Sequence, residues 1–132
     1  MRSSVLIIGL AIAAPFISTG CSKQVSFSAD VQPVLNEYCI MCHDGKGEGS
    51  EKSGYILTSY TDVMTGTKFG PVIVPGDSES STLYRVISGK VSPKIGMPPT
   101  GPASLAIGRG HELKPGQITA IQKWIDQGAL NN

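Results

Sequence analysis

The five residues from position 39 to 43, Cys-Ile-Met-Cys-His, constrain this chain more than any other stretch of its 132 residues. Two thiols lie three positions apart, on what would be one helical turn, and an imidazole follows directly. This is the attachment pattern of a c-type haem. Cys39 and Cys42 can each form a thioether with one of the two vinyl groups on one haem edge, which brings His43 to the iron as proximal ligand. The pattern occurs once, so we expect one covalently bound haem c per chain.

Two other interpretations of the cysteine pair are weaker. A Cys-x-x-Cys pair is also half of a zinc site, but a structural zinc ion takes four ligands. The rest of the chain offers only Cys21 and His111 as further cysteine or histidine ligands. A thioredoxin-like redox pair is expected near a βαβ pattern, and none surrounds these cysteines. Haem attachment is therefore the preferred interpretation.

A second informative stretch, residues 92–99, has prolines on both sides of Met97. Prolines fix the backbone and prevent a helix, so we expect a stiff loop. A weak thioether ligand needs such a loop, and His/Met ligation is typical of cytochromes c. Met97 is therefore the expected second axial ligand. The competitors are Met64, which fits the core face of a short helix, and His111, which would give a bis-histidine haem of lower potential.

The N-terminus is typical of an export signal. Arg2 supplies a positive start, and residues 5–17 form a nearly unbroken apolar run of thirteen residues. Such a run is too short for a comfortable membrane span and fits the apolar region of a signal peptide. We therefore expect an exported protein.

Residues 17–21, Ile-Ser-Thr-Gly-Cys, resemble a bacterial lipoprotein signal, although Ser18 stands where leucine is usual. In this interpretation residues 1–20 are a signal peptide and a lipidated Cys21 is the first residue of the mature protein. Residues 21–26 then tether it to the membrane, on the periplasmic face. The alternatives are an uncleaved N-terminal anchor and release as a soluble periplasmic protein.

The charge balance limits the class of partner. Eleven Lys and Arg residues face ten Asp and Glu residues, and Arg2 would be lost with the signal peptide. A neutral chain lacks the clustered positive charge that nucleic acid binding demands, so no nucleic acid partner is expected.

Apolar residues at steps of three and four predict a first amphipathic helix and a last one. The first stripe runs from Phe27 to Tyr38, with Asp30 or Ser28 as its N-cap. The last begins near Pro115, ends at Gly128 and carries Trp124 at the edge of its apolar face. Shorter helices are expected after Ser59 and around residues 82–88, whereas the polar, glycine-rich residues 44–54 are expected to form a solvated loop.

These features together resemble class I monohaem cytochromes c, and most of all the cytochrome c domains of planctomycete proteins. The matching blocks are Asp30-Val31-Gln32-Pro33-Val34-Leu35 before the haem motif, Val74-Pro75-Gly76-Asp77 with Ser81-x-Leu83, Met97-Pro98-Pro99, and Trp124-Ile125-x-x-Gly128-Ala129. The resemblance implies an all-α cytochrome c-like fold over residues 27–132, with the first and last helices crossing around the haem. It also implies covalent haem on Cys39 and Cys42, with iron between His43 and Met97.

The function expected from these features is electron transfer between redox partner proteins, by an electron carrier rather than an enzyme. Occupation of both axial positions keeps oxygen and peroxide from the iron, and no small-molecule substrate is expected. The alternative is a haem-based sensor or weak peroxidase in which Met97 is displaced by an external ligand.

Overall fold

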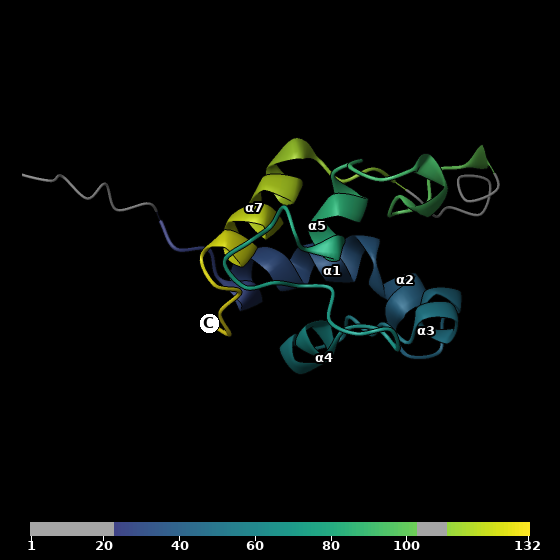
Figure 1. Cartoon of the computed structure of the whole chain (residues 1–132), viewed down its shortest axis with the longest axis horizontal. Coiled ribbons are helices and arrows are strands. Elements are labelled where there is room, and N and C mark those ends of the chain that lie inside the picture. The colour runs from purple at the N-terminus through teal and green to yellow at the C-terminus, as the bar shows by residue number, and fades with distance from the viewer. Residues whose placement is uncertain (1–22, 103–110) are drawn as a thin grey trace, which may run out of the picture.

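The computed structural model describes residues 23–102 and 111–132, and these residues form helices and loops without a β-strand (Figure 1). The expected helical class is confirmed for this part of the chain. In chain order the elements are the π-helical turn η1 (Phe27–Val31), α1 (Gln32–Tyr38), α2 (Ile40–His43), α3 (Glu48–Ser53), α4 (Tyr60–Thr65), α5 (Thr82–Ile87), the 3-10 turn η2 (Pro93–Ile95) and α7 (Pro115–Asp126). The predicted signal peptide and Cys21 lie outside the described residues.

The first helical stretch begins before both of its predicted caps. Ser26 occupies the N-cap, where its hydroxyl accepts a hydrogen bond from the Ala29 N–H at 3.2 Å. The Asp30 carboxylate accepts the Ser26 N–H at 2.8 Å. The prediction of Asp30 or Ser28 as N-cap was therefore wrong, because Asp30 instead closes a reciprocal capping pair from within the first turn.

The last helix, α7, packs on η1, as the expected contact between first and last helices requires (Figure 1). Trp124 is fully buried there, and its ring centroid lies 5.2 Å from that of Phe27. The Trp124 indole N–H donates to the Leu130 carbonyl at 2.9 Å. Aromatic burial of this kind contributes much of the stability of a small core.

Both ends of the described chain are fastened to this helix pair. The Asn132 carbonyl accepts the Ser28 N–H at 3.0 Å, and the Asn132 side-chain oxygen accepts the Phe27 N–H at 2.8 Å. The Gln127 side-chain oxygen accepts the Val25 N–H at 2.7 Å. These bonds hold the start of η1 and the C-terminus together.

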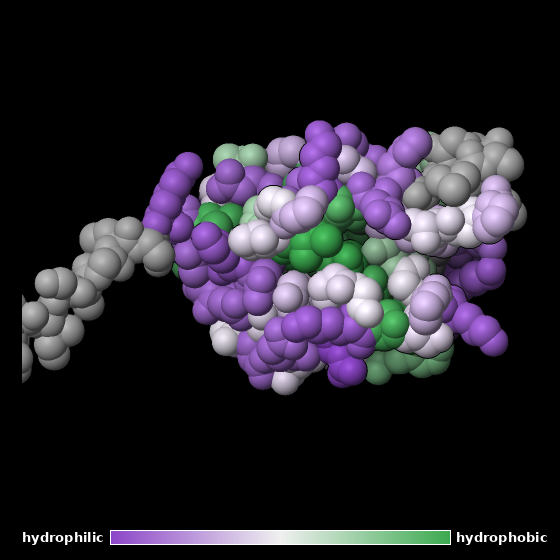
Figure 2. Space-filling model, turned by 90° about the horizontal axis from the view of Figure 1, so that it is seen from above, coloured by the Kyte–Doolittle hydropathy of each residue, from purple (hydrophilic) through white to green (hydrophobic). Residues whose placement is uncertain are grey.

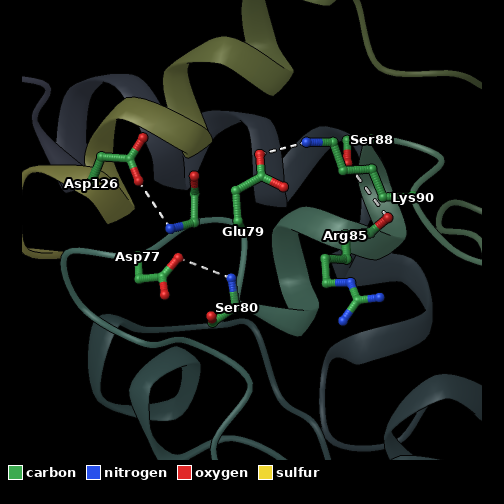
Figure 3. A network of polar contacts seen from close by, with 8 residues as sticks. Asp77, Glu79, Ser80, Arg85, Ser88, Lys90 and Asp126 are labelled. Carbon is green, nitrogen blue, oxygen red and sulfur yellow. Dashed lines mark hydrogen bonds and ion pairs between the residues drawn. The ribbon is translucent and has the colours of Figure 1, made fainter.

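Polar contacts join the loop before α5 to the end of α7 (Figure 3). The Asp126 carboxylate accepts the Ser78 N–H at 2.9 Å, and Asp77 accepts the Ser80 N–H at 3.0 Å. An ion pair between Lys90 and Glu79 spans the two ends of α5. The face in Figure 2 shows apolar side chains gathered in a hollow between polar ones.

The glycine-rich segment differs from its prediction as a solvated loop. It contains the helix α3, which packs on α2 (Figure 1). The side chain of Ser50 points inward and is buried, whereas Glu51 and Lys52 are exposed. Among the described residues, no helix combines the length and the apolar character that a membrane span needs.

Candidate haem site

A cavity of about 900 Å³ has both motif cysteines, His43 and Met97 in its wall. Its volume falls in the upper part of the range of roughly 300–1,000 Å³ that is usual for ligand pockets. The remaining wall is largely apolar. Its apolar residues include Tyr55, Leu57, Val72, Leu83, Val86, Ile87 and Ile95. Residues distant in sequence thus meet around one space that suits a large, flat, apolar group.

The motif forms one compact turn between α1 and α2. The Cys39 carbonyl accepts the N–H groups of Cys42 at 3.1 Å and of His43 at 3.0 Å. Both cysteines are free thiols, so both sulfurs are available for thioether bonds. Burial, and secondarily the proximity of Cys42, raises the pKa of the Cys39 thiol to about 12. That thiol therefore stays protonated at neutral pH.

The imidazole of His43 is held by a backbone carbonyl. Its Nδ1 lies 2.9 Å from the Tyr55 carbonyl oxygen, so the tautomer that satisfies this contact has Nδ1 as donor. Nε2 then keeps its lone pair for a metal ion, the arrangement that orients metal-binding histidines in general. Tyr55 is itself fixed, because its phenol donates to the Val63 carbonyl at 3.2 Å. Burial raises the pKa of this phenol, which stays neutral.

Two glycines allow α3 to approach this turn closely. A Cβ on Gly49 would lie 2.6 Å from His43 Nε2, and a Cβ on Gly47 would lie 2.8 Å from backbone atoms of Cys42. Real side chains do not make contacts this short, so these positions require glycine for the observed packing. The segment expected to be a solvated loop is therefore part of the cavity wall, beside the Nε2–Cε1 edge of His43.

Met97 reaches the cavity from the loop that follows α5. Its N–H donates to the Val86 carbonyl at 2.9 Å, which ties the loop to α5, and the residue is 40% exposed. The prediction that prolines exclude helical structure here was wrong for residues 93–95, which form the 3-10 turn η2. Pro93 is tolerated because the first helical position needs no N–H donor.

The competing iron ligands differ in position. Met64 packs against the core, as expected from the sequence. His111 is exposed and also contributes to the cavity wall, so it shares this region with Met97. The zinc interpretation gains no support, because no group of three or more His, Cys, Asp or Glu side chains suited to a metal ion occurs among residues 23–102 and 111–132. The roles of Cys39, Cys42, His43 and Met97 toward haem stay predictions, which this donor set and cavity fit.

Helices bring two motif cysteines, a histidine and a methionine to one apolar cavity. This is the arrangement expected of a cytochrome c domain. Residues 39–101 match the family model described as planctomycete cytochrome C. The matched stretch begins at the first motif cysteine and includes Met97. The match supports a planctomycete-type cytochrome c domain in this part of the chain, which suggests haem binding and electron transfer. Comparisons with curated proteins and with solved structures gave no match.

The groups that hold His43 were not predicted from the sequence. The Tyr55 carbonyl is a backbone atom, so its contact with His43 has no side-chain signature. Gly47 and Gly49 did carry a signal, because glycines spaced by two directly after a haem motif indicate a close backbone approach as readily as a flexible loop.

Proposed function

We propose that this protein is an electron carrier whose domain, residues 27–132, holds one haem c. Thioether bonds to Cys39 and Cys42 would attach the haem, and His43 and Met97 would ligate its iron. The observation that carries the proposal is that all four side chains line one apolar cavity. When bound, the haem supplies one-electron cycling between ferrous and ferric iron.

The chain's own residues support that role in three ways. The Tyr55 carbonyl orients His43 and increases the basicity of its imidazole. The bond from Met97 to Val86 restrains a weak thioether ligand. The apolar wall excludes water and favours the iron state of lower charge, which raises the reduction potential. Redox partner proteins would meet the open rim of the cavity, where Met41 and Ile95 are largely exposed.

We also propose that the protein is exported and anchored by lipid on Cys21 at the periplasmic face of a membrane. Support comes from the apolar N-terminal run and the small residues before this cysteine. Release as a soluble periplasmic protein is the alternative. The mass of the mature protein distinguishes them, because lipidation adds acyl chains to Cys21 and release leaves the residue unmodified or removes it.

The haem assignment is tested by expressing the full chain in a host with c-type haem assembly machinery. We expect a pyridine haemochrome spectrum and a haem stain that survives a denaturing gel. Cys39→Ala and Cys42→Ala should each remove most of the folded, coloured protein, because the small core then lacks its tethered haem. Cys21→Ala is the matched control and should keep the stain. A colourless wild-type protein, or full helicity in a haem-free cysteine variant, would contradict the proposal.

A further inference from the structure

One backbone oxygen near the proximal histidine has two hydrogen-bond donors. The Tyr55 carbonyl lies 2.9 Å from His43 Nδ1 and accepts the Ser50 hydroxyl at 3.1 Å. Ser50 belongs to α3, and only 6% of its surface is exposed. The second donor therefore comes from the glycine-rich segment that was expected to be a solvated loop.

The direction of the Ser50 hydroxyl is fixed by its surroundings. Its oxygen accepts the Gly45 N–H at 2.9 Å, so its single proton is left for the Tyr55 carbonyl. The turn before α3 is held in turn by the Asp44 carboxylate, which accepts the N–H groups of Lys46 at 2.8 Å and Gly47 at 2.7 Å. Ser50 is thus a rigid donor rather than a freely rotating surface hydroxyl.

Two donors on one carbonyl oxygen share its electron density, so each bond is weaker than it would be alone. The bond from His43 Nδ1 controls how much negative charge the imidazole carries, and therefore how strongly Nε2 donates to iron. A weaker bond at Nδ1 makes a weaker donor, which stabilises ferric iron less. With haem bound, the Ser50 hydroxyl would therefore shift the equilibrium of the iron toward the ferrous state.

We propose that Ser50 is a positioning residue that sets the reduction potential through the Tyr55 carbonyl and His43. This inference rests on the proposed ligation of haem iron by His43. It assigns to the segment of residues 44–54 a function as a potential-tuning element beside the proximal ligand, beyond covering the histidine.

Replacing the hydroxyl tests the inference. In Ser50→Ala, the Tyr55 carbonyl accepts a hydrogen bond from His43 alone, and the reduction potential should fall. At a fixed ambient potential, the ferric-to-ferrous ratio should rise roughly twofold to tenfold, the effect of one net hydrogen bond. A tenfold change corresponds to about 59 mV for one electron. In the reduced protein, the proton magnetic resonance of His43 Nδ1–H should move downfield. Ser50→Thr keeps a hydroxyl and should keep the wild-type values.

Ser81→Ala is the matched control. Ser81 is fully buried, and its hydroxyl donates to the Asp77 carbonyl at 2.8 Å, so this variant also loses a buried serine hydroxyl on a backbone carbonyl. It should lower stability without moving the potential or the His43 resonance. Equal shifts in Ser50→Ala and Ser81→Ala would reduce Ser50 to a general structural role and overturn the inference.

The remaining outcomes separate this inference from the haem assignment. A haem-stained wild-type protein whose potential and His43 resonance are unchanged in Ser50→Ala overturns the inference alone. A colourless wild-type protein overturns both. If Ser50→Ala does not mature, the inference is tested on the wild-type protein. The Ser50 hydroxyl proton and the His43 Nδ1 proton point to one oxygen, so they should show a mutual nuclear Overhauser effect. Its absence would overturn the inference.

Discussion

Met97 and His43 are held in different ways. The His43 ring itself is bonded, through Nδ1 at 2.9 Å from the Tyr55 carbonyl. Met97 is fixed through its backbone N–H, while the residue as a whole is 40% exposed. A thioether is also a weaker ligand than an imidazole. An external ligand would therefore reach the iron first from the side of Met97. Whether such a ligand displaces Met97 distinguishes a sensor from an electron carrier.

Replacement of Met97 should open that side. We expect the reduced wild-type protein to bind carbon monoxide slowly at neutral pH, and Met97→Ala to bind it faster by roughly tenfold or more. The reason is that a state with Met97 displaced would be a minor one, of at most about 10%. Stopped-flow absorbance at the Soret band measures the rate. Met64→Ala, which removes a methionine packed against the core, should stay slow.

Two results would contradict these expectations. Rapid binding by the wild-type protein would favour the sensor or weak peroxidase. Slow binding by Met97→Ala would point to His111, which shares the cavity wall, as the ligand in place of Met97.

At the scale of elements, the contact between α2 and α3 depends on the absence of a side chain at position 49. In Gly49→Ala, the new Cβ would lie 2.6 Å from Nε2 and 2.7 Å from Cε1 of His43. The hydrogen-bonded turn of residues 39–43 limits how far the ring can move, so we expect a loss of about 1–3 kcal/mol in the free energy of unfolding. Denaturant unfolding followed by circular dichroism measures this loss.

Gly116→Ala is the control for the added methyl group. Gly116 lies in the first turn of α7, and a Cβ there would meet no atom within 4 Å. This variant should be neutral, or more stable by up to about 1 kcal/mol, because alanine favours helix. Equal stability of the two variants would show that α3 moves away from His43 at little cost.

The same elements show which structural features a sequence reveals. Periodicity located α7 and the stretch from Phe27 to Tyr38, because burial of an apolar stripe is a local pattern. It missed α3, because Gly47 and Gly49 have low helix propensity and their packing on Cys42 and His43 is tertiary. The four proposed haem-binding residues could be named in advance, since each carries its own chemistry. Ser50 could not, because it acts on a backbone carbonyl.

At the scale of the whole molecule, aspartates near the starts of helices predict how the stability of the fold depends on pH in acid. Asp62, in the first turn of α4, accepts the hydroxyls of Ser59 at 2.6 Å and Thr58 at 2.7 Å. These bonds, the one from Ser59 foremost, lower the pKa of Asp62. Hydrogen bonds from Ser80 likewise lower the pKa of Asp77 in the loop before α5. Both groups therefore favour the folded state in their ionised form.

The sign of the pH dependence follows from these lowered pKa values. A carboxylate with a lower pKa in the folded state adds stability above its unfolded pKa, and this stability is lost as the pH falls through the folded value. We therefore expect a constant thermal midpoint at neutral pH, and a decline that begins near the ordinary aspartate pKa of 3.8 and continues below it. Far-ultraviolet circular dichroism measures the loss of the helices at each pH.

Replacing the Asp62 carboxylate shows how much it contributes to the fall of the thermal midpoint in acid. Asp62→Asn should lower the thermal midpoint at neutral pH but leave a shallower fall in acid, so that the wild-type and variant curves converge below the folded pKa. Glu51→Gln, at an exposed position of α3, is the control for the loss of one negative charge and should run parallel to the wild type. Asp62→Asn and wild-type curves that stay parallel down to the lowest pH would show that the Ser59 and Thr58 hydroxyls do not stabilise the ionised form.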